Sequence, residues 1–252
     1  MLASLVLPVM LLCQSAAELP TPADGKKLSV ELVTEVWSGF TEPDQSGAYF
    51  ELVNLIYQPW QPKLKVKFTN FNRAVTLVKQ GKADMTLAVS AHDREKLLLS
   101  ELPIDKDQIL AIYNPNYHKV TRIDDLHSLR LAWNLAYDFG AIVGVNSQGY
   151  EVPSVAQGIE LVVNQRIDVY LSEQSQYEYY LQQHSKNTLP LETIVIGSDL
   201  IYAAFANNDK GQQLKCIWDK RFQLLAEKGE LQQLYQRFNA FHLVLDEASG
   251  LK

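Results

Sequence analysis

Arg94 is the residue whose neighbours in the sequence first indicate chemistry. It stands alone between a stretch of small and apolar residues that ends at Ser90 and an apolar run that ends at Pro103. A guanidinium in such a loop binds a carboxylate through two parallel hydrogen bonds. The alternative is that Arg94 is an exposed residue at the start of a helix, with Asp93 near its N-cap position. The sequence leaves both interpretations open.

The sequence lacks the common motifs of enzymes and metal sites. No HExxH, CxxC, GxGxxG, GxxxxGK[ST] or GxSxG pattern occurs. The five histidines lie far apart, so no pair has the spacing of metal ligands. We therefore expect no catalytic residue, no metal and no cofactor. His92, close to Arg94, is either a ligand contact or a solvated loop residue.

Composition argues against several classes of partner. The 23 Lys and Arg residues stand against 29 Asp and Glu residues, which gives a net charge of −6. Such a chain has no electrostatic basis for holding a phosphate backbone, and it contains no basic run of five or more residues. We expect no nucleic-acid partner, no adsorption to an anionic membrane, and a monomer.

The first residues are typical of an export signal. An apolar run over 2–12 precedes small residues at Ser15 and Ala17, a spacing that a signal peptidase accepts. The run is shorter than the ~20 apolar residues that span a bilayer. We predict that residues 1–17 are a signal peptide and that the mature protein is periplasmic. A lipid anchor on Cys13 is the less favoured alternative.

Strand-like and helix-like segments alternate along the chain, which predicts an α/β fold with mainly parallel sheets. Alternating or β-branched segments predict strands, whereas apolar residues at helical spacing predict helices. The predicted strands are 28–36, 65–68, 83–89, 129–133, 167–171 and 192–197. The predicted helices are 47–59, 71–80, 123–129, 154–165, 174–184, 211–229 and 230–238. Cys216 lies opposite the apolar stripe of its helix, so we expect it to be exposed.

Two extended segments, 108–115 and 201–206, connect the predicted halves of the chain. We expect them to act as crossovers between two lobes, so that a hinge motion encloses a ligand. Lobe 1 comprises residues 26–110 and 203–252, and lobe 2 comprises residues 111–202. The alternative is a single continuous sheet without such motion, which has the same periodicity.

Six short motifs occur in a characteristic order. They are VTEVWSGF, SGAYFELV, VKQGKADM, HDREKLLLSELP, NQRIDVYLSE and LAEKGELQQLYQRF. In this order, over residues 28–238, the chain resembles the family 3 periplasmic solute-binding proteins, the receptors of polar amino acid uptake systems. The resemblance implies a two-lobed periplasmic-binding-protein fold of type II, hinged by two crossover strands. It also implies capture of a small polar solute, an amino acid or related small carboxylate, for a membrane ABC transporter.

The same resemblance implies a ligand site. Arg94 would bind the α-carboxylate of the ligand, and Glu173, from the other lobe, would accept hydrogen bonds from its α-amino group. Trp37 and Phe40 match the aromatic loop that encloses the ligand's side chain in the family. Tyr137 falls near a loop that donates hydrogen bonds to the ligand. Each of these residues also has an ordinary interpretation, as core for the aromatic residues and as a solvated side chain for Glu173.

Ser90 and His92 complete the expected ligand contacts. The family carries hydroxyl groups three and five positions before its arginine, where this chain has Ala91 and Val89. Ser90 and His92 are the polar residues nearest to those positions.

Two other functions remain open, a dehydratase-type enzyme on the same scaffold with Glu173 as its acid, and a stand-alone periplasmic sensor.

Overall fold

The computed structural model describes residues 28–93, 95–135, 137, 139–145, 149–184 and 189–238. Arg94 and the predicted signal peptide lie outside these residues. The described chain forms two compact units, and each is described by itself. Unit 1 comprises the described residues up to Ile104 and from Tyr202 onward, and unit 2 comprises Asp105–Ile201.

The sheet of unit 1 is built around a parallel trio of strands. β1 lies between β2 and β3, with Leu32 of β1 opposite Val66 of β2 and Met85 of β3. A short strand, β4, runs antiparallel to the last residues of β9. The strands are β1 (Ser29–Thr34), β2 (Lys63–Phe68), β3 (Met85–Ser90), β4 (Leu97–Leu99) and β9 (Glu192–Ala206), of which only the last part belongs to this unit.

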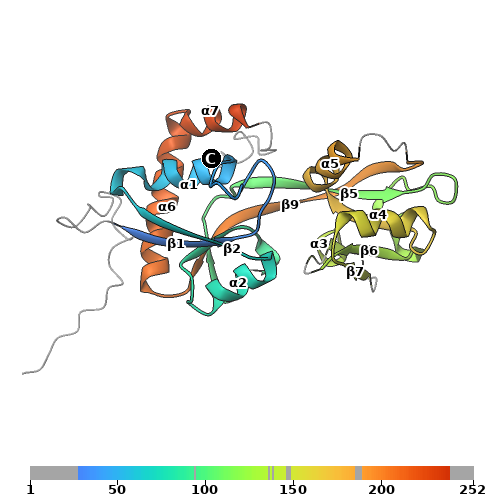
Figure 1. Cartoon of the computed structure of the whole chain (residues 1–252), viewed down its shortest axis with the longest axis horizontal. Helices are drawn as coiled ribbons and strands as arrows, with labels where there is room; N and C mark the ends of the chain where they lie inside the picture. The colour runs from blue at the N-terminus through green and yellow to red at the C-terminus, as the bar shows by residue number, and fades with distance from the viewer. Residues whose placement is uncertain are drawn as a thin grey trace, which may run out of the picture. The chain divides into compact units, whose positions relative to one another are not determined.

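Helices cover both faces of this sheet. Figure 1 shows α2 on one side of β1 and β2, with α1 and α7 on the other. The side chain of Asn70 accepts a hydrogen bond from the backbone N–H of Arg73, which caps the start of α2. The helical segments are α1 (Ala48–Tyr57), η1 (Gln58–Trp60), α2 (Phe71–Lys79), η2 (Ala91–Asp93), α6 (Asp209–Glu227) and α7 (Glu230–Arg237).

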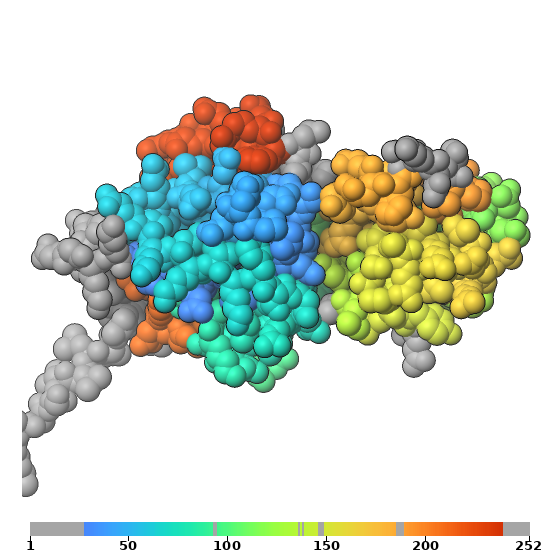
Figure 2. All heavy atoms as spheres, viewed as in Figure 1, coloured from blue at the N-terminus to red at the C-terminus, as the bar shows by residue number. Residues whose placement is uncertain are grey.

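Unit 2 has a mixed sheet in the order β9-β5-β8-β6-β7. β5 runs antiparallel to both β8 and β9, while β6 runs parallel to β7 and β8. α4 and α5 cover the face of the unit seen in Figure 2. The elements are β5 (Asp105–Tyr113), η3 (Ile123–Ser128), β6 (Leu131–Asn134), α3 (Phe139–Ile142), β7 (Tyr150–Val152), α4 (Val155–Val163), β8 (Val169–Glu173) and α5 (Gln174–Gln183).

The α/β alternation predicted from the sequence is confirmed, with three differences. The segment after Arg94 does not start a helix, because Leu97–Leu99 pairs with the residues Ala204 to Ala206 of β9. The predicted strand at 192–197 and the crossover at 201–206 are one continuous strand, β9. The short elements η1, η2, β4, α3 and β7 were not predicted from the sequence.

The expected exposure of Cys216 is wrong, because this residue is buried. α6 contacts α1, α7 and β4, so its buried surface is wider than the single apolar stripe that the sequence predicts. No helix in the described part of the chain is long and apolar enough to cross a bilayer.

Candidate functional site

The predicted ligand contacts of unit 1 follow the carboxyl ends of two neighbouring parallel strands. Trp37 and Phe40 come after β1, and Ser90 ends β3 with His92 directly after it. Open α/β sheets bind ligands at this edge, because loops from several strands meet there. Trp37, Phe40, Ser90 and His92 therefore lie on a common edge of the unit 1 sheet.

Hydrogen bonds fix the loop that carries the aromatic residues. The Thr41 hydroxyl accepts from the Trp37 backbone N–H at 3.0 Å and donates to the Glu35 carbonyl oxygen at 2.7 Å. The Trp37 carbonyl oxygen accepts from the backbone N–H groups of Phe40 and Thr41. Gly47 closes the loop with a φ of 108°, and a Cβ there would lie 2.5 Å from the Phe40 carbonyl oxygen.

The two aromatic residues differ in exposure. The Phe40 ring is buried and lies 4.8 Å from the ring of Tyr49, centroid to centroid. Trp37 is half-buried, with its ring 5.9 Å from Phe71 and 6.5 Å from Tyr49. Phe40 thus belongs to the core of the loop, whereas the Trp37 side chain is partly exposed.

The Glu35 carboxylate binds the backbone of Phe71, whose ring contacts Trp37. Oε2 of Glu35 accepts a hydrogen bond from the backbone N–H of Phe71, the first residue of α2, at 3.0 Å. Burial raises the pKa of Glu35, and the Phe71 N–H partly opposes that shift. Glu35 thereby ties the end of β1 to the start of α2.

Ser90 and His92 form a local turn. Ser90 is buried, and its hydroxyl oxygen accepts a hydrogen bond from the His92 backbone N–H at 3.2 Å. The His92 side chain is exposed. Arg94, the next predicted contact, lies outside the described residues.

In unit 2, Tyr137 follows the carboxyl end of β6, and Glu173 is the last residue of β8, the neighbouring parallel strand. The structure brings them together through Gln176 of α5. Its Nε2 donates to Oε2 of Glu173 at 2.6 Å and lies 3.5 Å from the Tyr137 hydroxyl oxygen. The two side chains that the resemblance placed at the ligand therefore share one neighbour.

The hydrogen-bonded chain continues into the core of unit 2. Nδ2 of Asn134 donates to Oε1 of Gln176 at 2.9 Å, and the buried Tyr170 hydroxyl donates to Oδ1 of Asn134 at 2.7 Å. Each amide therefore has its oxygen and nitrogen directed by a neighbour. These hydrogen bonds fix the position of Gln176, which binds Glu173 from α5.

Asp107 of β5 is the second acidic side chain at Glu173. In the pairing of β5 with β8, Glu173 lies opposite Ile109, two residues along β5 from Asp107. Burial raises the pKa of Asp107 well above its usual range, and the charges of Glu173, Asp105 and Asp199 raise it further. Asp107 therefore keeps its proton to a higher pH than an exposed aspartate does.

Sequence reasoning missed Asp107, Asn134 and Gln176. A signal for Asp107 was present, since the run DKD at 105–107 places two carboxylates on one face of a strand. Asn134 and Gln176 carry no such signal, because neutral amides are common at the ends of strands and on exposed helices.

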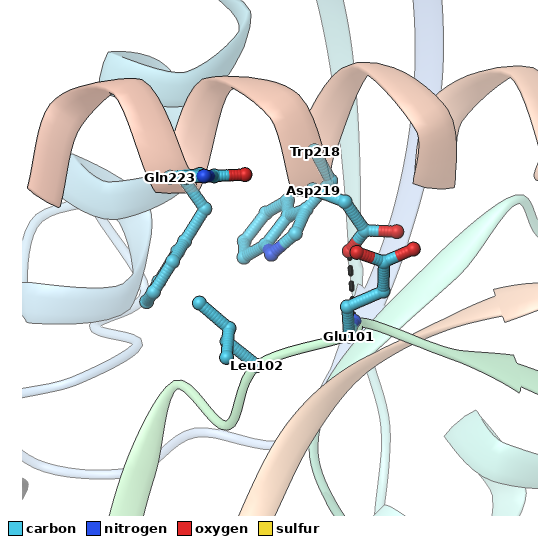
Figure 3. A pocket seen from close by; sticks show the side chains of 6 residues that line it. Glu101, Leu102, Trp218, Asp219 and Gln223 are labelled. Atoms are coloured by element: carbon cyan, nitrogen blue, oxygen red, sulfur yellow. Dashed lines mark hydrogen bonds between the residues drawn. The ribbon is translucent and has the colours of Figure 1, made fainter. Parts of the chain in front are cut away.

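A separate pocket of about 290 Å³ lies in unit 1 between α6 and the segment that precedes β5. Its lining residues are Glu101, Leu102, Trp218, Asp219, Phe222 and Gln223, most of which are labelled in Figure 3. Asp219 accepts a hydrogen bond from the Glu101 backbone N–H at 2.8 Å, which holds this segment against the helix. None of the predicted ligand contacts that the structure describes lines it.

Chains of known structure resemble this one closely in fold. A "histidine kinase sensor domain with similarity to periplasmic binding proteins" superposes with a TM-score of 0.70 at 12% identity, over 86% of this chain and 97% of that one. The arginine-, lysine-, histidine-binding protein ArtJ from Geobacillus stearothermophilus gives 0.69 at 13% identity, over 89% and 100%.

An ABC uptake transporter substrate-binding protein from Streptococcus pneumoniae with bound histidine gives a TM-score of 0.64 at 16% identity, over 83% of this chain and 92% of that one. No protein-family model and no curated protein matches the sequence. The likeness is therefore one of fold, and it covers nearly the full length of these chains. The fold class predicted from the sequence is confirmed: this chain has the fold of the periplasmic binding proteins.

Proposed function

We propose that this protein is a solute-binding receptor of the periplasm. It captures a small polar solute, an amino acid or related small carboxylate, and delivers it to a membrane ABC transporter without chemistry of its own. One observation carries the proposal: a fixed carboxylate, Glu173, stands at the carboxyl edge of unit 2, held by Gln176 at 2.6 Å. The names of similar folds, which include receptors for histidine and for arginine, support an amino acid as the solute.

The residue roles in this proposal follow the sequence resemblance. Glu173 accepts hydrogen bonds from the ligand's ammonium group, and Arg94 pairs with its carboxylate. Trp37 and Tyr137 contact the rest of the ligand, with Ser90 and His92 as nearby polar groups. Phe40 supports the loop from within, because its ring is buried.

The first experiment is a thermal-shift screen of the mature protein against amino acids, polyamines, small carboxylates and sugars. A solute at 100 times its dissociation constant adds about 2.7 kcal/mol to the free energy of unfolding, which is readily measured. If no amino acid or carboxylate raises the melting temperature, the proposed ligand class is wrong.

The second experiment replaces Arg94 by alanine. We expect the melting temperature of the empty protein to stay nearly unchanged and the binding free energy to fall by about 2–5 kcal/mol, the cost of removing one partner of a buried charge pair. The control is Arg122→Ala, which removes an exposed arginine of unit 2. If Arg94→Ala binds the solute as tightly as wild type does, Arg94 is not a ligand contact.

Ligand closure is tested by small-angle scattering. The proposal expects the radius of gyration to fall when the solute binds, because only contacts that differ between open and closed states shift their balance. Glu173→Gln keeps the size and one acceptor of the side chain but removes its charge. It should bind more weakly and compact less than wild type.

A sensor is the second candidate function, and one observation favours it. A histidine kinase sensor domain is among the most similar folds, with a TM-score of 0.70. A receptor for uptake and a sensor both bind a solute, so affinity does not separate them. Uptake of the radiolabelled solute by cells with and without the gene separates the two functions. A transport receptor is required for uptake, whereas a sensor is not.

An enzyme on this scaffold would convert its ligand. Mass spectrometry of the solute recovered after prolonged incubation with the protein tests this directly. We expect the recovered solute to be chemically unchanged.

A further inference from the structure

The pocket of unit 1 beside α6 contains a hydrogen-bond donor that has no acceptor among the described residues. Trp218 lines this pocket and is fully buried, and its Nε1–H has no hydrogen-bond partner in the described part of the chain. Figure 3 shows this nitrogen on the side of the indole ring that faces away from α6, toward Leu102. The donor is therefore directed into the pocket.

Neighbouring rings hold Trp218 in this orientation. Tyr57 and Phe205 lie 6.0 Å and 5.9 Å from its ring, centroid to centroid. Turning the indole toward another acceptor requires these rings to move, because a packed core leaves little space for a second orientation. A buried N–H group without an acceptor is uncommon and destabilises a protein, unless water or a ligand accepts its hydrogen bond.

The walls of the pocket next to this donor are apolar. Leu102 comes from the segment that precedes β5, and Phe222 lies one turn of α6 after Trp218. The volume of about 290 Å³ is many times the ~30 Å³ that one water occupies in the liquid. Displacement of poorly ordered water by an apolar group is favourable. These walls therefore favour an organic molecule over water.

The charged groups of the pocket disfavour an anion. Asp219 accepts hydrogen bonds from Nζ of Lys215 at 2.5 Å and from the Glu101 backbone N–H at 2.8 Å. The Glu101 side chain is 75% exposed and lies 4.0 Å from the same lysine. Gln223 contributes a neutral amide, whose nitrogen donates to Glu227 at 3.1 Å. Lys215 thus contacts two carboxylates, and the three groups together carry a net negative charge.

We infer that this pocket binds a small molecule with a flat apolar body, one hydrogen-bond acceptor and no negative charge. The acceptor, a carbonyl, hydroxyl or ring nitrogen atom, accepts from Nε1–H of Trp218, while the apolar body packs against Leu102 and Phe222. This is a second site, independent of the proposed receptor function, because none of the predicted solute contacts that the structure describes lines the pocket.

NMR of the isotope-labelled protein provides the first measurement. The chain has four tryptophans, and Trp218→Phe identifies the indole N–H signal of Trp218. The probes are benzamide, nicotinamide and tyramine, and their anionic counterparts are benzoate, nicotinate and para-hydroxyphenylacetate. At least one probe should shift the Trp218 signal in a saturable way. Its counterpart should bind about tenfold more weakly, because it brings a second negative charge to the carboxylates.

Two substitutions test the contacts by ligand-observed NMR. Trp218→Phe keeps an aromatic ring but removes the donor, so affinity for the probe should fall roughly fivefold, the effect of one hydrogen bond. Trp133→Phe, the same change in the core of unit 2, should leave this affinity unchanged.

Glu101→Gln changes an exposed side chain, so it tests the pocket without disturbing the core. It should reduce the preference for the probe over its anionic counterpart. Asp209→Asn, which removes an exposed carboxylate from the start of α6, should keep that preference.

The outcomes separate this site from the proposed solute site. If no probe shifts the Trp218 signal at millimolar concentration, the inference is wrong and water satisfies the donor. A shift of the Trp37 signal alone would place the probe at the solute site and would also overturn it. If the anionic counterpart binds as tightly as the probe, the inferred ligand class is wrong. Failure of the receptor function leaves these results unchanged, because none of them uses the solute.

Discussion

Nε2 of Gln176 donates a hydrogen bond to Oε2 of Glu173 across 2.6 Å, from the first turn of α5 to the last residue of β8. The amide oxygen of Gln176 is itself held by Asn134 at 2.9 Å. Asn134 therefore fixes the orientation of the Gln176 amide. Gln176 in turn orients the Glu173 carboxylate, which we propose binds the ligand.

Gln176→Met should weaken solute binding without unfolding the protein. Methionine preserves the length of the side chain but removes the hydrogen bond that orients Glu173, which is worth about 1 kcal/mol, or roughly fivefold in affinity. Gln174→Met is the matched control. Gln174 lies on the same helix, and its side-chain amide donates a hydrogen bond to Glu178 rather than to Glu173. Titration calorimetry of both variants compares them, and equal affinities would deny Gln176 a positioning role.

Trp37→Ala and Phe40→Ala should separate binding from stability. Phe40 is buried against Tyr49, so its loss should lower the free energy of unfolding by roughly 3 kcal/mol. Trp37 is half-buried, so Trp37→Ala should lower the free energy of unfolding by less than Phe40→Ala does. It should weaken ligand binding by more. Urea denaturation and ligand titration measure the two effects, and the reverse order would place Phe40 rather than Trp37 at the ligand.

Asp168→Asn should destabilise unit 2. The Asp168 carboxylate accepts from Nη2 of Arg130 at 2.6 Å and from its backbone N–H at 2.8 Å, which joins the start of β8 to the residue before β6. Because the Arg130 side chain is 51% exposed, water weakens the pair, and we expect a loss of about 1–2 kcal/mol at pH 7.

The same pair predicts a pH dependence. Hydrogen bonds from Arg130 lower the pKa of Asp168, so its stabilisation is present above the unfolded-state pKa of about 3.9 and is lost as the pH falls below it. Asp124→Asn is the control, since its partner Arg122 is exposed and 3.6 Å away. Urea denaturation measures the free energy of unfolding of wild type and of Asp168→Asn. The difference between the two proteins should be smaller at low pH than at pH 7.

Asp107→Asn should change the pH dependence of stability in the opposite direction. A carboxyl whose pKa is raised in the folded state stabilises fully below its unfolded pKa and loses that contribution as the pH rises toward the folded value. The wild-type melting temperature should therefore fall more steeply than that of Asp107→Asn from about pH 4 upward. Parallel curves for the two proteins would contradict a raised pKa at this residue.

The sequence by itself determined the α/β alternation and most of its elements, because these depend on local patterns. Apolar residues at helical spacing define α2, and Asn70 caps it through a side chain only three residues from its partner. The same local information predicted that Trp37 and Glu173 follow strands. Resemblance in the order of short motifs then predicted the fold that the structural comparisons confirm.

Tertiary structure decided the features that depend on distant partners. Leu97–Leu99 is a strand because Ala204 to Ala206 lies beside it, more than 100 residues later in the chain. Cys216 is buried because α6 contacts several neighbours. Asp107 and Glu173 lie on one face of the sheet only because β5 runs antiparallel to β8 in this register, and burial together with the nearby carboxylates raises the pKa of Asp107.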